Sequence, residues 1–387
     1  MPEVVISGIG AMPVGEQWGQ SLRDLGAEAI LAAILDAGGV RPQALYIGNL
    51  LASTLSHQSN LGALLTDYAG LDGIEAFTVE AGEASGAAAF RQGYLAVQSG
   101  YVDNVLVLGI EKITDVTDGL ESTLAQVLDY DYEAVHGLTR ESIAGLLMQR
   151  YLHDYHLPTD ALMGFPMLAH RNAVGNPLAM YRKAIRADSY RNAPMLSAPL
   201  SLFDAAPLAD GAAAVMLTRS DLIPVGLPHV PVRVLGSSSV IDTLSLHDRD
   251  NPLAFHAAQY SMEGACRQAG LLPGDVDLFE LDDAFSIYAA LSLEAAGLAE
   301  RGEGWKFVPM LEGQVQTPSL PLLTFGGGKA RGYPVAASGM YQIIEAVQQL
   351  RGTAGVNQVP NACKALVQSL GGAAATAVTH VLERYEC

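Results

Sequence analysis

The chain has 387 residues; half are apolar, 16% are charged, and the formal net charge at pH 7 is -19. This length exceeds one ordinary hydrophobic core and predicts two domains or two similar halves, and the composition excludes a disordered chain. The acidic balance argues against nucleic acid or an anionic membrane as a partner, because both repel an acidic surface. A small anionic ligand stays compatible with a local basic patch.

Cysteine usage and the N-terminus bear on the compartment. Cys266, Cys363 and Cys387 stand at unrelated spacings without a CxxC pair, which predicts neither a disulfide framework nor a zinc ribbon and favours a reducing cytoplasm. The opening stretch MPEVVISGIGAM lacks the basic region and long apolar segment of a signal peptide. No apolar run approaches the about 20 residues of a membrane-spanning helix. We expect a soluble, cytoplasmic protein without a membrane partner.

The first 112 residues alternate between strand and helix patterns. Apolar periodicity, glycine stops and short buried runs predict strands at 4–12, 44–53, 76–82 and 104–112, with helices at 21–39, 59–70 and 85–100. This alternation predicts a mostly parallel sheet covered by helices.

From about residue 114 to residue 199 the pattern changes to charged segments rich in Tyr and Met, which predicts an inserted and mostly helical region. Its expected helices lie at 141–156, 164–174 and 180–190. Beyond it, strands are expected at 211–218, 232–240, 276–286, 364–372 and 373–382, with helices at 257–270 and within 326–352. Ala84-Ser85-Gly86 and Ala337-Ser338-Gly339 each open a helix that precedes a buried strand, which predicts an internal duplication.

Several short motifs bear on ligand chemistry. Gly8-Ile9-Gly10 lacks the third glycine of a dinucleotide fingerprint, and Gly326-Gly327-Gly328-Lys329 is followed by Ala330 where a phosphate loop has Ser or Thr. The glycine run is therefore interpreted as a close approach of backbone to backbone or to a ligand. Asp282-Asp283 at a strand end is either a metal or general-base pair or a solvated pair. His153 and His156 lack a third ligand, so no metal site is expected.

Five blocks in order carry a resemblance to a known family. They are VEAGEASGAAAFRQGYLAVQSG with its following strand, SLFDAAPLADGAAAVML, FELDDAFS, GGGKARGYPVAASG and QSLGGAAATAVTHVL. Together they resemble a thiolase of the archaeal and sterol-carrier-protein type, over residues 4 to 382. The resemblance implies the α/β thiolase fold, with two similar halves in five α-β-α-β-α layers. The expected halves are 1–222, with 114–199 as an inserted loop domain, and 223–387.

The resemblance also implies that the usual catalytic side chains have been replaced. Where the family has Cys-Ala-Ser-Gly at a helix N-terminus, this chain has Glu83 before Ala-Ser-Gly. The family's Gly-His-Pro reads Gly332-Tyr333-Pro334, its His-Asp motif begins with Asp282, and a second cysteine position is Ser369. The glycines that shape the pocket remain, namely Gly332, Gly371 and Gly372. None of the three cysteines is expected to serve as a nucleophile.

By resemblance Glu83, Asp282 and Tyr333 converge on one pocket, where one of two close carboxyl groups should have a raised pKa. Three hypotheses follow. The first is a protein of acyl-CoA (lipid) metabolism that binds an acyl-CoA thioester without Cys-dependent thiolysis or condensation. The second is an active acyltransferase, hydrolase or decarboxylase with Glu83 as base or nucleophile and Tyr333 as proton donor, and the third is a non-catalytic structural subunit. No cofactor is expected beyond a coenzyme A thioester as ligand. A homodimer is expected, with a small OB-fold and zinc-ribbon protein as a further candidate partner.

Overall fold

A single nine-stranded sheet organises the protein. The computed structural model describes residues 3–385, and its strands pair in the order β3-β2-β4-β7-β1-β8-β13-β12-β9. Their bounds are β1 (Val4–Ala11), β2 (Ala44–Gly48), β3 (Glu75–Val79), β4 (Asn104–Glu111), β7 (Gly211–Arg219), β8 (Val232–Ile241), β9 (Leu278–Glu280), β12 (Lys364–Gly371) and β13 (Thr376–Arg384). Two further pairs are β5 (Met195–Ser197) with β6 (Leu200–Ser201), and β10 (Met310–Leu311) with β11 (Gln314–Val315).

The sheet is mixed, so the expectation of a mostly parallel sheet was wrong. Only β2–β3, β2–β4 and β9–β12 pair in parallel, whereas β7 and β13 run antiparallel to both of their neighbours. The reason is connectivity. A short turn leads directly from β12 into β13, and a tight connection places the second strand antiparallel to the first.

The predicted duplication is confirmed by the strand order. Read from the centre outward, the first half runs β1-β7-β4-β2 and the second half runs β8-β13-β12-β9. The two halves meet where β1 pairs with β8 at only two positions, Val5 with Arg233 and Ile6 with Val232. Helices α4 (Ser85–Gln98) and α12 (Ser338–Arg351) hold equivalent places and are both 14 residues long.

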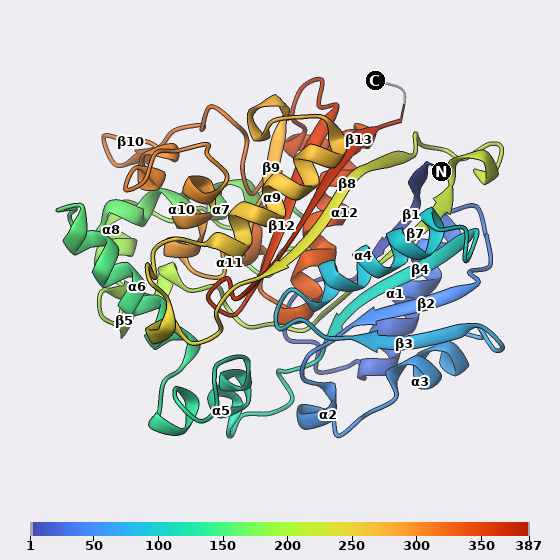
Figure 1. The fold of residues 1–387 in the computed structure, drawn as a ribbon, viewed down its shortest axis with the longest axis horizontal. Coiled ribbons are helices and arrows are strands. Elements are labelled where there is room, and N and C mark those ends of the chain that lie inside the picture. Colours follow the sequence, from blue (N-terminus) through green and yellow to red (C-terminus); the bar gives the residue numbers. More distant parts are fainter. Residues whose placement is uncertain (1–2, 386–387) are drawn as a thin grey trace.

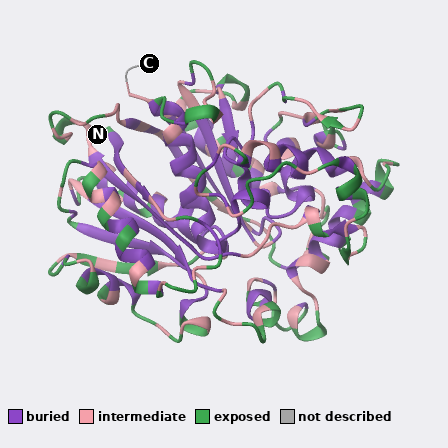
Figure 2. Ribbon diagram, turned by 180° about the vertical axis from the view of Figure 1, so that it is seen from behind, coloured by how far each residue is buried: buried purple, intermediate pink, exposed green. Residues whose placement is uncertain are grey.

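Because the two halves of the sheet are joined only where β1 meets β8, each half forms its own layer, and the helices outside and between them complete five layers (Figure 1). Helices α1 (Leu22–Asp36) and α3 (Leu61–Tyr68) cover the outer face of the first half, and α9 (His256–Ala269) with the adjoining α10 (Ser286–Ala295) lies outside the second. Helices α4 and α12 pack against each other between the halves. Thirteen of the 14 residues of α12 are buried, which fits a helix enclosed on every side, and Figure 2 shows the buried residues concentrated in the sheet and these central helices.

Small residues permit this central contact. A Cβ atom on Gly339 would lie 2.6 Å from Ser369 Oγ and 3.0 Å from Ala87 Cβ, and one on Gly86 would lie 2.5 Å from the carbonyl oxygen of Ala336. Larger side chains at these two glycines would push the helices apart. The two Ala-Ser-Gly triplets are therefore positions where the halves approach most closely.

The region between β4 and β7 contains α5 (Leu120–Leu124), α6 (Arg140–Asp154), α7 (Gly164–Ala173) and α8 (Ala187–Arg191). The helix expected over 180–190 is wrong in its first part, because the backbone N-H groups of Met180 and Tyr181 donate to carbonyls of α11 (Gly327–Arg331) instead. Likewise β2 stops at Gly48, since Asn49 accepts the N-H of Ala52 and starts the short α2 (Ala52–Leu55). Within residues 3–385 no helix has the length and apolar character needed to cross a membrane.

Candidate active site

A small closed cavity lies at the start of α4. Glu83, in the turn that leads from β3 into α4, faces it and is only 4% exposed. The free volume is about 10 Å³, close to the space of one water molecule. Its lining residues are Glu83, Leu128, Arg140, Asp282, Ala284, Phe285, Tyr288, Tyr333, Leu370, Gly372 and Ala373. Segments from both halves and from the insertion thus meet here.

Glu83 has both carboxylate oxygens engaged. Oε1 accepts a hydrogen bond from Arg140 Nε over 2.8 Å, and Oε2 accepts one from the backbone N-H of Gly372 over 2.6 Å. Charge-assisted bonds of this length are among the stronger ones in proteins. Burial of the carboxylate is therefore compensated by a cation and a backbone donor.

Arg140 was not singled out by sequence reasoning. It begins α6, where Thr139 caps the helix by accepting the N-H of Ser142. Its guanidinium carbon lies 5.5 Å from the ring centres of both Phe285 and Tyr333. Burial lowers the pKa of Arg140, but the charges of Glu83 and, to a smaller extent, Tyr333 outweigh it and raise this pKa above its ordinary value. One signal could have found it: a cation in the first turn of a helix opposes the helix dipole and needs an anionic partner elsewhere.

Asp282 comes two residues after the end of β9. Its Oδ1 accepts the N-H of Ala284 over 2.9 Å, and its Oδ2 accepts that of Leu370 over 3.3 Å. Burial raises the pKa of Asp282 to about 7, and the charges of Asp283 and Glu83 act in the same direction. A carboxyl group with such a pKa can both take up and release a proton near neutrality.

Two phenols complete the polar lining. Tyr333 and Tyr288 are both buried, and burial followed by nearby carboxylates raises the pKa of Tyr333 well above its ordinary value. Burial also raises the pKa of Tyr288. Among residues 3–385 neither hydroxyl has a hydrogen-bond partner, so both are available to a ligand as proton donors. Tyr288 lies in α10 and was also missed, since its position is indistinguishable from an apolar core position in the sequence.

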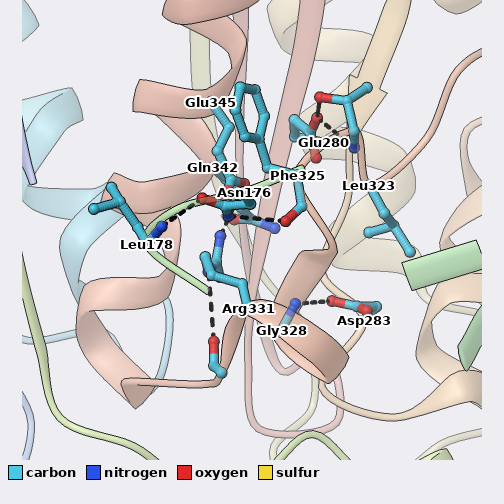
Figure 3. A network of polar contacts seen from close by, with 12 residues as sticks. Asn176, Leu178, Glu280, Asp283, Leu323, Phe325, Gly328, Arg331, Gln342 and Glu345 are labelled. Atoms are coloured by element: carbon cyan, nitrogen blue, oxygen red, sulfur yellow. Dashed lines mark hydrogen bonds and ion pairs between the residues drawn. The ribbon is translucent and has the colours of Figure 1, made fainter. Parts of the chain in front are cut away.

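Asp283 lies behind the cavity and forms part of a buried polar network (Figure 3). Its Oδ1 accepts the N-H of Gly328 over 2.6 Å, and Arg331 of the same short helix pairs with Glu345 over 2.8 Å. Both Asp282 and Asp283 are almost fully buried, so the interpretation as a solvated pair is wrong. The glycine run was correctly interpreted as a close approach of backbone to backbone, because a Cβ on Gly326 would lie 3.0 Å from Ala173 Cα and 3.2 Å from the carbonyl oxygen of Ala169 in α7. A Cβ on Gly327 would lie 2.5 Å from Asp283 Oδ2, a side-chain atom.

Of the remaining predicted residues, one lines the cavity and the others support the backbone around it. Gly372 lines the cavity, whereas Gly332 and Gly371 do not. Gly332 has a φ of 103°, and a Cβ on Gly371 would lie 2.5 Å from the carbonyl oxygen of Ala81, so both are required by backbone geometry. Ser369 Oγ donates to Gln342 Oε1 over 2.6 Å and is likewise not a lining residue.

No cysteine lines the cavity among the described residues. Cys266 is a buried free thiol on α9 whose pKa is raised to about 11 by burial. Cys363 is disulfide-bonded, a bond that the cysteine spacing did not predict, and Cys387 lies outside the described residues. Neither described cysteine therefore faces the cavity that Glu83 lines.

The fold and this arrangement define a thiolase-type protein. Residues 4–221 match the family described as thiolase, N-terminal domain, and residues 238–384 match thiolase C-terminal domain-like. The chain therefore belongs to the thiolase family.

Known relatives agree with this assignment. An acetyl-CoA acetyltransferase from Methanothermobacter thermautotrophicus is 37% identical, over 99% of this chain and 100% of the relative. Sterol carrier protein 2 from Oryctolagus cuniculus is 29% identical, over 80% of this chain and 59% of that protein. A solved structure described as "Ltp2-ChsH2(DUF35) aldolase" is 25% identical with a TM-score of 0.86, covering 99% of this chain and 98% of the other.

Proposed function

We propose that this protein is a thiolase-fold enzyme that makes or breaks a carbon-carbon bond in a hydroxyacyl-CoA thioester by acid-base chemistry, without a covalent acyl-enzyme. The observation that carries the proposal is the grouping of Asp282, Tyr288 and Tyr333 around one cavity in which Glu83 is already paired. The resemblance to a solved aldolase over nearly the whole of both chains supports the same reaction class.

Glu83 serves in this proposal as a positioning residue. A nucleophilic or general-base role for Glu83 would require its ion pair with Arg140 to break, whereas Asp282 accepts only two backbone N-H groups and has no ion-pair partner within residues 3–385. The ion pair instead fixes the guanidinium between two aromatic rings. Arg140 Nε is engaged, and its two terminal nitrogens donate no hydrogen bond to any residue within 3–385, which leaves them free to bind an oxyanion.

In the cleavage direction, Asp282 takes the proton of the β-hydroxyl group, and a carbonyl forms as the bond between Cα and Cβ breaks. The bonding electrons pass into the thioester as an enolate, whose oxygen is bound by the terminal nitrogens of Arg140. A phenol, Tyr333 or Tyr288, then donates a proton to Cα. The raised pKa of both phenols keeps them protonated at neutral pH until the enolate, a stronger base, takes the proton. The proton held by Asp282 then passes to the phenolate, which restores both groups.

The test is incubation of the purified protein with a panel of 3-hydroxyacyl-CoA thioesters, followed by mass spectrometry of all products. A carbon-carbon lyase releases a shortened acyl-CoA and a free aldehyde or ketone. Thiolysis or hydrolysis would instead change the amount of free CoA. Tyr333→Phe and Asp282→Asn should each lower kcat by about 100-fold or more, whereas Tyr260→Phe on the exposed surface of α9 should not.

A non-catalytic CoA-binding or structural subunit is the second candidate, and the closed cavity favours it. A volume of about 10 Å³ admits no thioester until the lining side chains move. Calorimetry with acetyl-CoA separates the cases. Binding without turnover across the panel indicates a ligand-binding subunit, and absence of both binding and turnover indicates a structural one. Either result contradicts the proposed lyase activity.

We further propose a homodimer and a small partner subunit. Strand β3 is an edge strand with Glu75, Phe77 and Thr78 exposed, and an open groove lined by Tyr46, Phe77 and Tyr101 runs beside it. An edge of this kind fits pairing with a second copy. The solved aldolase is named with a DUF35 component, which supports a small partner here. Light scattering of wild type and Phe77→Glu tests the dimer.

A further inference from the structure

A second cavity lies beside the candidate active site and shares no lining residue with it. Its volume is about 340 Å³, within the range of about 300–1,000 Å³ that is usual for small-molecule sites. Its walls are mostly apolar, and four titratable side chains face it. The lining residues are Glu141, His170, Tyr181, Leu196, Leu202, Phe203, Ala205, Ala206, Pro207, Leu208 and Lys329.

A single strip of backbone, residues 205–208, separates this cavity from the active site. The strip is anchored at both ends to residues that line the active site: Ala205 pairs with Phe285, and Leu208 pairs with Tyr333. Between them the N-H of Ala206 donates to the carbonyl of Ala284 over 2.8 Å. A ligand in the second cavity would therefore contact one side of this strip, and Tyr333 and Phe285 of the active site pair with the same strip.

The base of this cavity holds the ammonium of Lys329, whose pKa burial lowers to about 8 against the opposing charges of Asp283 and Asp204. Lys329 is 2% exposed, and its ammonium donates one hydrogen bond, to the carbonyl of Asp204 over 2.5 Å. Its other two N-H groups have no partner within residues 3–385. His170 is also buried; its Nδ1 meets the carbonyl of Lys183, and its Nε2 has no partner within residues 3–385. A buried ammonium with free donors is costly unless an acceptor completes it.

Aromatic side chains surround the buried end of this cavity. His170 stacks at 24° on Tyr181, with ring centres 6.3 Å apart, and meets Phe203 edge-on. Leu196 and Leu202, each close to half exposed, stand among the lining residues and give the more open part of the cavity an apolar character. Glu141 is the one acidic side chain in the lining and is partly exposed. The cavity is thus cationic at its buried end and apolar along its sides.

We infer that this cavity binds an amphipathic monocarboxylate, with its carboxylate on Lys329 and His170 and its hydrocarbon body against Leu196, Leu202 and Phe203. The unused ammonium donors at the buried end supply the recognition of the acid, and the apolar walls supply the affinity for the chain. This site is separate from the proposed lyase centre and does not depend on it.

Isothermal titration of the full-length protein with octanoate tests the inference, with 1-octanol as the probe that lacks the acid. Octanoate should bind saturably, and 1-octanol should bind about tenfold or more weakly, as the loss of a charged hydrogen bond implies. Leu202→Trp should abolish binding by filling the cavity. Glu141→Gln should tighten binding of octanoate by removing a nearby negative charge.

Lys329→Gln should bind octanoate about tenfold or more weakly. Because Lys329 is buried, this variant counts only when its circular dichroism spectrum matches wild type, and Leu202→Trp and Glu141→Gln carry the test without it. Leu272→Trp is the matched control, since Leu272 is an exposed leucine in a different groove, between α9 and α10. No saturable octanoate binding, equal affinity for 1-octanol, or unchanged binding in Leu202→Trp would overturn the inference. Loss of binding in Leu272→Trp alone would place octanoate in the other groove and also overturn it.

Discussion

Arg140 and Glu83 form a buried ion pair of 2.8 Å that joins the first turn of α6 to the turn before α4. The pair ties the inserted region to the core at the position where the thiolase resemblance places a cysteine. Both side chains are at most 6% exposed, so neither charge is screened by water. Glu83 therefore both lines the cavity and holds the Arg140 guanidinium in place.

Breaking this pair on one side should destabilise the protein strongly. Glu83→Ala leaves a buried guanidinium without its counter-charge, which typically costs about 3–5 kcal/mol. The double variant Glu83→Leu with Arg140→Met should recover much of the loss, because apolar replacement of a whole buried pair is often close to neutral. Urea denaturation of the single and double variants measures both effects.

The exposed pair Arg150–Asp154 provides the control for that series. It lies on the surface of α6, and Arg150→Ala should change the free energy of unfolding by no more than about 1 kcal/mol. A Glu83→Ala protein as stable as Arg150→Ala would show that the buried pair contributes little, and would remove the argument that it anchors the insertion.

The activity proposed for this site should depend on the ionisation of Asp282. A general base works only when deprotonated, so kcat/KM should rise with pH up to about 7, the pKa to which burial raises Asp282, and then level off. In Asp282→Asn the remaining activity should lack that rise. A pH profile of kcat/KM for both proteins measures this. An identical rise in the variant would assign the pKa to another group.

Much of the fold was accessible from the sequence because burial leaves a periodic signal. The strands from Val4, Asn104 and Lys364 and the helices from Ser85 and Ser338 lie where apolar runs and glycine stops indicated. Strand direction leaves no such signal, since a buried strand has the same pattern in either orientation. The antiparallel return of β7 and β13 therefore could not be deduced from periodicity.

The candidate site was predictable only where it coincides with matched blocks. Glu83, Asp282 and Tyr333 stand within such blocks, and the structure brings them to one cavity. Arg140 stands in the insertion, which matched the family loosely, and its partner lies 57 residues away in the chain. Lys329 faces the second cavity because α11 packs against Asp283. This contact joins segments far apart in the chain, so no local sequence pattern predicts it.

Stability should fall with rising pH because of Glu280. Burial, aided by the charge of Glu345, raises its pKa from 4.5 to about 8. The folded state thus binds the proton more tightly than the unfolded state between these values, and stability is lost as the pH rises through that window by up to about 1.4 kcal/mol per unit. Oε1 accepts from Thr324, whereas Oε2 has no partner within residues 3–385 (Figure 3).

Glu280→Gln cannot ionise and should reduce that dependence by the contribution of one group, while Asp282 and Glu111, whose pKa values burial also raises, keep theirs. The variant should be more stable than wild type at pH 8, and the difference should shrink toward pH 5, where the wild-type carboxyl is protonated when folded. Denaturation curves at several pH values provide the measurement, with exposed Glu303→Gln as the control that leaves the dependence intact. A Glu280→Gln protein with the wild-type slope would assign it to another buried carboxyl, such as that of Glu111.

The close approach of the two halves should make Gly339 intolerant of a side chain. A Cβ there would lie 2.6 Å from Ser369 Oγ and 3.1 Å from the backbone nitrogen of Ala87, and such overpacking costs about 1–3 kcal/mol. Alanine regains up to about 1 kcal/mol of helix propensity, so Gly339→Ala should be mildly destabilising and Gly339→Val severely so. Gly274→Ala is the control, because a Cβ at that position meets nothing within 4 Å. Thermal denaturation in which Gly339→Val matched Gly274→Ala would mean that α4 and α12 can separate without loss, contrary to the packing of the halves.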